Sequence, residues 1–164
     1  MKTGKRLLSL LLAVIMVLSV VPVIAARGAF EKTETWSDAL FTDVAELDWF
    51  HDNVKGAYEL GLMEGQGNGL FAPEGSITLA ETVTVAARIH AIYHGGEDFI
   101  QGTPWYQVYV DYALANGILK AAPADCSEAA TRLEFAEILS RALPESELKA
   151  INKVDDGRPL LKRW

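Results

Sequence analysis

The sequence contains Trp49-Phe-His-Asp-Asn-Val-Lys-Gly-Ala-Tyr-Glu-Leu-Gly61, which aligns without a gap on Trp105-Tyr-Gln-Val-Tyr-Val-Asp-Tyr-Ala-Leu-Ala-Asn-Gly117. Both stretches open on an aromatic pair, carry apolar residues at helical spacing and end on glycine. Glycine commonly ends helices because it adopts the left-handed backbone conformation without strain. The two stretches therefore predict equivalent helices that start near Trp49 and Trp105.

Each copy continues into a second segment that carries a helix-start signal. Thr78-Leu-Ala-Glu81 in the first copy matches Thr131-Arg-Leu-Glu134 in the second. Threonine followed three residues later by glutamate is typical of a capping box, in which the hydroxyl accepts from a first-turn amide and the carboxylate accepts from the amide of the cap residue. Apolar residues follow at helical spacing in both copies. We therefore expect an all-α protein built from repeated helix-loop-helix hairpins, with little or no strand.

The order of these motifs resembles a repeat of the S-layer homology family. In the first copy, five sub-motifs follow one another as they do in that family: Phe41-Thr-Asp-Val44, Trp49-Phe50, Gly61-Leu-Met-Glu-Gly65, Leu70-Phe-Ala-Pro73 and Ile77-Thr-Leu-Ala-Glu81. The second copy keeps the aromatic pair, the glycine and the capping box, but its middle loop, 120–130, lacks the Phe-x-Pro element. The resemblance implies one repeat at 41–95 and a second at 102–146.

The same resemblance implies how the repeats pack. Three repeats usually form a pseudo-threefold helical bundle in that family, with one helix of each repeat at the centre. Residues 147–164 begin like a third repeat but do not continue it. We therefore expect an incomplete bundle, and we interpret the chain as a truncated product with exposed apolar surface.

The N-terminal residues have the pattern of a secretory signal peptide. Three basic residues precede a mostly apolar run from Leu7 to Val21, and small residues follow at a cleavage pattern. The run is shorter than the about 20 residues that a membrane-spanning helix needs. We expect removal of residues 1–25, a flexible lead-in at 26–40 and no stable membrane span afterwards. The protein is therefore expected to be secreted, and the resemblance implies that it is held at the cell wall and cell surface.

Composition argues against a nucleic-acid partner and excludes a disulfide within the chain. The formal net charge is −7, and removal of the basic leader makes it more negative, which argues against a nucleic-acid partner. The single cysteine, Cys126, has no partner within the chain for a disulfide. No cofactor is expected.

The resemblance also implies a carbohydrate site in the grooves between repeats. The family binds a secondary cell-wall polysaccharide attached to peptidoglycan, often through a pyruvylated, acidic sugar, and the arginine of its Thr-Arg-Ala-Glu motif is associated with that binding. Arg132 holds this position in the second copy and Leu79 in the first. An arginine can grip a carboxylate with two parallel hydrogen bonds, so an arginine at Leu79 is expected to strengthen binding. The alternative for Arg132 is a solvated side chain, although the helix dipole disfavours a cation there.

Four other residues are candidate carbohydrate contacts: Glu134 of the same motif, Trp49, Trp105 and Asp43. Tryptophan faces stack on sugar rings, yet a tryptophan at a helix start is more often a core anchor, and we prefer that interpretation. Asp43 either accepts sugar hydroxyls or holds the loop before the first helix, and the second role is preferred.

The remaining polar motifs indicate structural roles. Arg88 and Arg141 recur at the same place in both copies and are interpreted as helix-end contacts. His90 and His94 have a zinc-binding spacing, with Glu97 nearby, but no further convincing ligand, so no metal site is expected. No nucleophile and base can be assembled into a catalytic set, so an enzyme is not expected.

The resemblance therefore implies non-covalent anchoring at the cell surface through secondary cell-wall polysaccharide. The alternative is a non-catalytic module that binds a protein partner or self-associates to complete the bundle.

Overall fold

The computed structural model describes residues 30–96 and 99–148. The expected signal peptide and almost all of the expected third repeat lie outside the described residues. The elements are α2 (His51–Glu59), α3 (Leu79–Tyr93), α4 (Gln107–Ala115), α5 (Arg132–Ser140) and a short 3-10 helix, η1 (Glu145–Glu147). The described ranges form only isolated β-bridges and no strand, so the all-α class is confirmed. None of these helices is long and apolar enough to cross a membrane.

The helix starts lie where the capping boxes predict them. Thr78 Oγ1 accepts from the amide of Glu81 at 3.2 Å, and Glu81 Oε2 accepts from the amide of Thr78 at 2.7 Å. The same pair of bonds joins Thr131 and Glu134, at 3.3 and 2.8 Å. Two otherwise free amides are thus satisfied at the start of α3 and again at the start of α5.

The ends of the other two helices also agree with the sequence. Gly61 follows α2 with a φ of +65°, and Gly117 follows α4 with a φ of +73°. Most residues with a Cβ are strained in this left-handed region, so glycine is favoured at both positions.

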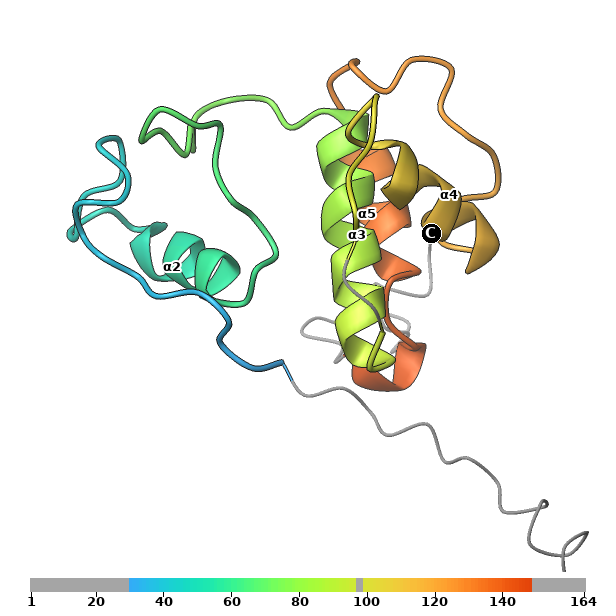
Figure 1. Cartoon of the computed structure of the whole chain (residues 1–164), viewed down its shortest axis with the longest axis horizontal. Coiled ribbons are helices and arrows are strands. Elements are labelled where there is room, and N and C mark those ends of the chain that lie inside the picture. The colour runs from blue at the N-terminus through green and yellow to red at the C-terminus, as the bar shows by residue number, and fades with distance from the viewer. Residues whose placement is uncertain (1–29, 97–98, 149–164) are drawn as a thin grey trace, which may run out of the picture.

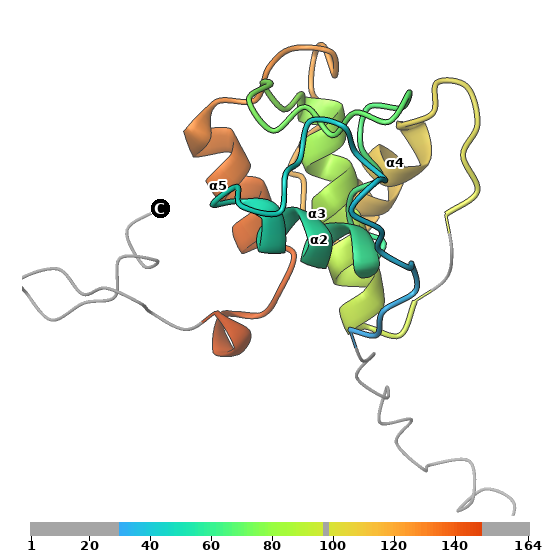
Figure 2. The same cartoon turned by 90° about the vertical axis from the view of Figure 1, so that its left-hand side faces the viewer.

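The main core surrounds α3, which packs against both α4 and α5 (Figure 1) and lies between them in the view of Figure 2. Val83, Ala86 and Ala87 of α3 are fully buried, and small side chains at this point let the neighbouring helices approach closely. Tyr109 of α4 and Ile138 of α5 are buried against this face. The core is therefore built mainly from helices of both repeats around one central helix.

A second, smaller cluster holds α2. Figure 1 shows α2 to one side of the α3, α4 and α5 group, and Figure 2 looks onto it from that side. Among the described helices, α3 packs mainly against α4 and α5 and not against α2, its partner in the expected hairpin of the first repeat. Instead, Val54 and Tyr58 of α2 belong to a cluster with aromatic and apolar residues before and after the helix: Trp36, Leu40, Phe41, Val44, Phe50 and Phe71.

The segment before the first repeat, expected to be a flexible lead-in, contacts α2 in its described part. The amide of Thr33 donates to the carbonyl of Glu59 at 2.8 Å, and Lys32 pairs with the Glu59 carboxylate at 2.6 Å. Trp36 packs edge-on against Tyr58 with ring centroids 6.1 Å apart. Burial of the large apolar face of Trp36 against α2 stabilises the contact of this otherwise polar segment with the helix.

The two repeats are joined at the N-terminus of α3. The amides of Leu79 and Ala80 donate to the carbonyls of Glu128 and Cys126, at 2.8 and 2.9 Å. First-turn amides of a helix have no partner within the helix, so the loop of the second repeat supplies acceptors for two of them. This contact fixes the second repeat relative to α3.

Candidate functional site

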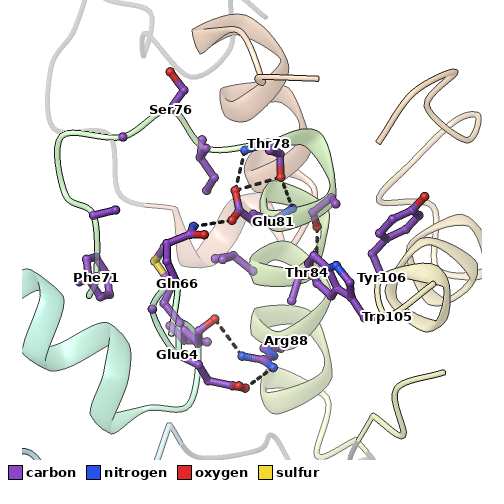
Figure 3. A pocket seen from close by; sticks show the side chains of 18 of the residues that line it. Glu64, Gln66, Phe71, Ser76, Thr78, Glu81, Thr84, Arg88, Trp105 and Tyr106 are labelled. Carbon is purple, nitrogen blue, oxygen red and sulfur yellow. Dashed lines mark hydrogen bonds and ion pairs between the residues drawn. The ribbon is translucent and has the colours of Figure 1, made fainter. Parts of the chain in front are cut away.

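A groove of about 640 Å³ lies between the two repeats. Figure 3 shows its walls: the middle loop of the first repeat carries Glu64 and Gln66, and the opposite wall carries Trp105 and Tyr106 just before α4. Helix α3 forms the floor through residues such as Thr84. The volume is within the about 300–1,000 Å³ that is typical of small-molecule pockets.

Polar groups on one side of this groove are held in place by Glu81. Its Oε1 accepts from Gln66 Nε2 at 2.6 Å, while Oε2 accepts from the amide and the hydroxyl of Thr78. Partial burial opposes ionisation of Glu81, but these hydrogen bonds outweigh it and keep the pKa of the carboxyl below its usual value. The capping carboxylate therefore also positions an amide side chain in the groove.

Arg88 lies at the bottom of the groove and connects both repeats. Its Nη1 donates to the carbonyls of Gly61 and Leu62, at 3.2 and 3.3 Å. Its Nη2 donates to the carboxylate of Glu64 and, at 3.0 Å, to the hydroxyl of Tyr109 on α4. Four interactions from one guanidinium thus tie the end of α2, the middle loop and α4 to α3.

Arg141 occupies the equivalent place in the second repeat. Its Nη1 donates to the carbonyl of Ile118 at 3.5 Å, and its Nη2 lies 3.6 Å from Glu137 Oε2. Ile118 follows the terminating glycine of α4 as Leu62 follows that of α2. The interpretation of both arginines as helix-end contacts is confirmed, with longer distances in the second copy.

Arg132 and Glu134 do not line this groove. Arg132 is exposed on the first turn of α5, and Glu134 is engaged in the capping box of that helix. Leu79, which matches Arg132 in the first repeat, is only 8% exposed because the loop of the second repeat covers it. An arginine at Leu79 would bury a charge, which argues against the expectation that it strengthens binding.

The two tryptophans are exposed, and the preferred interpretation of both as core anchors is wrong. Trp49 is 86% exposed and Trp105 is 42% exposed. The following aromatic residue takes the core position in each copy, because Phe50 packs on the α2 cluster and Tyr106 on the main core. Trp105 lines the groove and Trp49 does not.

Asp43 holds a loop, but not the loop directly before the first helix. Its two carboxylate oxygens accept from the amides of Phe71 and Ala72, at 2.9 and 2.7 Å. The bond from Phe71 is the largest influence and lowers the pKa of Asp43. Asp43 thus fixes the Phe-x-Pro loop that forms part of the groove wall.

Asp43→Asn is expected to make stability less sensitive to acid. The folded pKa of Asp43 is depressed, so its contribution is present above the unfolded value and is lost as pH falls through the folded value. Urea unfolding at about pH 6 and about pH 3 should therefore show a smaller drop for the variant than for the native chain. Glu46→Gln, an exposed residue nearby, is the control and should keep the native drop. An identical drop in both variants would contradict this role for Asp43.

His90 lies on α3 and His94 directly follows that helix, and their rings contact each other and Tyr112. The rings of His90 and His94 lie 4.2 Å apart, and His90 Nδ1 lies 2.9 Å from the hydroxyl of Tyr112. Burial, together with the neighbouring His94, lowers the pKa of His90. The part of the chain that the structure describes contains no group of three metal-ligating side chains, and Glu97 lies outside it.

Comparison with known proteins adds two findings. Residues 40–83, which include the first capping box and one wall of the groove, match the S-layer homology domain. The chain is also 28% identical over 135 residues to the surface-layer 125 kDa protein of Lysinibacillus sphaericus, which covers 76% of this chain. The alignment spans 11% of that relative, so the relative is far longer. No solved structure matches the chain. The domain and the relative indicate a cell-surface protein associated with the S-layer.

Proposed function

We propose, because the chain carries an S-layer homology domain, that it is a non-catalytic module that holds its protein at the cell surface by binding a secondary cell-wall polysaccharide. The groove between the repeats supports this proposal most strongly. It combines a half-exposed aromatic face, Trp105, with the polar side chains of Gln66 and Ser76. Carbohydrate sites need this combination because sugar rings stack on aromatic faces while their hydroxyls form hydrogen bonds.

Pull-down with purified cell-wall sacculi tests the proposal. The protein should sediment with sacculi that carry their polysaccharide and remain in solution with sacculi from which it has been chemically removed. Equal sedimentation with both preparations would point to peptidoglycan itself as the target. No sedimentation with either would contradict the proposed function.

Arg132 is proposed to contact an acidic unit of the same polymer, such as a pyruvylated sugar. Its guanidinium is exposed at the start of α5, so both edges of the fork remain accessible to a carboxylate. Arg132→Ala should weaken sacculus binding by about ten- to a hundredfold, because a charge-assisted hydrogen bond contributes about 1.5–3 kcal/mol.

Helicity should not change in the Arg132→Ala variant, and circular dichroism checks that. Lys120→Ala removes one exposed positive charge elsewhere and controls for bulk charge. Native binding by a folded Arg132→Ala protein would remove Arg132 from the site. Equal losses in both variants would indicate only a general charge effect.

The alternative function, self-association, has one observation in its favour. Leu133 and Phe135 are exposed near the start of α5, whereas Leu79 and Ala80 at the matching turn of α3 are covered by the second repeat. Exposed apolar side chains on a helix are typical of an interaction surface. Size-exclusion chromatography over a range of concentrations distinguishes the two, since a monomer at all concentrations would argue against self-association.

A further inference from the structure

We propose that copies of this chain bind one another head to tail, with the first repeat of one copy covering helix α5 of the next. The contact would repeat, between two molecules, the packing that joins the two repeats within one molecule. It involves no polysaccharide and is therefore independent of the function proposed above.

Within the chain, the second repeat covers one face of α3. This face consists of Ala80, Thr84 and Arg88, which are spaced four residues apart. The carbonyl of Cys126 accepts from the amide of Ala80, and the hydroxyl of Tyr109 accepts from Arg88. Ala80 and Thr84 are only 4% and 7% exposed, and the Arg88 side chain is 13% exposed. The second repeat thus buries this face of α3.

Helix α5 carries the same face without such a cover. Leu133, Glu137 and Arg141 follow the capping threonine of α5 at the matching distances. Leu133 is 51% exposed, and the side chains of Glu137 and Arg141 are 43% and 29% exposed. The amides of Arg132 and Leu133 have no acceptor in the described part of the chain, whereas the matching amides of α3 have one each. Helix α5 therefore exposes the surface that α3 buries.

The first repeat carries the complementary surface. In the second repeat, the face of α4 that begins at Trp105 packs on α3 through Tyr109, which is 1% exposed. Trp49 and Asn53 hold the matching positions of the first repeat; Trp49 is 86% exposed and Asn53 is exposed as well. Helix α2 makes no comparable contact with another described helix. The amide oxygen of Asn53 is also an acceptor for the arginine of the α5 face, as the Tyr109 hydroxyl is for that of α3.

The loops beside these two faces have matching unpaired backbone groups. Loop 126–130 of the second repeat supplies two carbonyls to the first amides of α3. Loop 73–77 occupies the same place in the first repeat, directly before Thr78. The carbonyls of Pro73 and Gly75 match the two carbonyls that α3 uses, and they have no donor among the described residues. In the proposed contact they accept from the first two amides of α5 of the next copy, so that donors and acceptors are both satisfied.

A pair of opposite charges also fits this contact. Arg132 stands where α3 has the apolar Leu79, and Glu74 stands where loop 126–130 has Ser127. Covering an arginine is unfavourable without an acidic partner, and Glu74 of the neighbouring copy supplies one. A second copy and an acidic sugar would therefore compete for Arg132.

The proposed contact joins two different surfaces of the chain, so it is heterologous. A copy that binds through its first repeat still exposes its own α5 to a further copy. Association therefore continues until a ring closes, or it produces open chains. Species larger than a dimer are expected.

Analytical ultracentrifugation of the secreted protein, without polysaccharide, tests the proposal. The average mass should rise with protein concentration beyond that of a dimer. Leu133→Glu and Trp49→Glu should each weaken association at least about tenfold, because each removes a large apolar side chain from the contact. Ile100→Glu, at an exposed apolar residue outside both faces, should associate like the native chain. A native protein that is monomeric at every concentration would overturn the proposal.

A mixture of the Leu133→Glu and Trp49→Glu chains separates a head-to-tail contact from a symmetric one. Each variant keeps one intact face. An equimolar mixture should therefore form dimers that do not grow further, at a concentration at which neither variant associates alone. A symmetric contact between two α5 helices would instead leave Trp49→Glu with native association. That result, or a mixture that stays monomeric, would overturn the head-to-tail arrangement.

Exchange of the charged pair tests the position of loop 73–77. Arg132→Glu and Glu74→Arg should each weaken association at least about fivefold, because each places like charges opposite one another. The double variant should regain most of the native association, since the two charges are exchanged across the contact. Circular dichroism checks that each variant is folded. A double variant that associates no better than the single ones would overturn the placement of this loop on α5, and sacculus binding by a monomeric chain would leave the proposed function intact.

Discussion

Arg88→Ala is expected to lower the free energy of unfolding by about 2–4 kcal/mol, because it leaves partly buried acceptors without their donor. The carbonyls of Gly61 and Leu62 and the hydroxyl of Tyr109 all accept from this guanidinium. Tyr109 keeps a second bond, from Gln101 at 3.1 Å, so the two carbonyls carry most of the cost. Glu64 is largely exposed, so water replaces Arg88 as its partner in the variant. The loss of this ion pair therefore adds little to the change in the free energy of unfolding.

Arg141→Ala is the matched control for this experiment. Arg141 occupies the equivalent place, but its side chain is 29% exposed and its contacts are 3.5 and 3.6 Å long. Its removal should cost less than about 1 kcal/mol, as is usual for partly exposed ion pairs. Urea unfolding, followed by circular dichroism, measures the free energy of unfolding of both variants. Equal losses in the two variants would mean that Arg88 does not connect the repeats in the way its contacts indicate.

Local signals were sufficient to predict the helices. Each capping box needs only residues three positions apart, and the two bonds that define it form wherever the helix forms. Gly61 and Gly117 likewise act through their own backbone conformation. Features that depend only on residues within one helical turn can be predicted without knowing which other segments pack against that turn.

Features that depend on contacts between distant segments were not predictable in the same way. Leu79 and Arg132 hold equivalent positions in the two repeats. The second repeat covers Leu79, whereas Arg132 is exposed. Nothing within either motif reports that difference. Trp49 and Trp105 were misplaced for a related reason, since an aromatic pair at a helix start does not say which ring faces the core.

The candidate site was predicted only in outline. The resemblance implied a groove between repeats, and Trp105 does line one. The parts played by Gln66 and Glu64 were missed, because the motif that contains Glu64 does not say what its side chain contacts, and Gln66 belongs to none of the motifs. Arg88 had a usable signal, since its recurrence as Arg141 indicated a shared contact, but the four partners of Arg88 come from segments far apart in the sequence.

Gly65→Ala is expected to destabilise the protein by about 2–4 kcal/mol, through backbone strain and a steric clash together. Gly65 has a φ of +81°, where a Cβ is strained. A Cβ there would lie 2.7 Å from the carbonyl oxygen of Leu70 and 2.7 Å from a ring carbon of Phe41. Phe41 is only 5% exposed in the α2 cluster, so its ring has little room to move.

Gly67→Ala separates the two contributions. Gly67 belongs to the same loop and has a similar φ of +84°, but nothing lies within 4 Å of a Cβ placed there. Gly67→Ala should lower the free energy of unfolding only by the cost of the strained backbone, about 1 kcal/mol. Thermal unfolding of Gly65→Ala and Gly67→Ala measures the difference in stability between the two variants. Because the loop from Gly65 carries Gln66 into the groove, the Gly65 variant should also bind sacculi more weakly at temperatures where it remains folded. Equal stability of the two variants would show that Phe41 and the Leu70 carbonyl yield to the new methyl group, and that the loop is not held against the α2 cluster as tightly as these distances indicate.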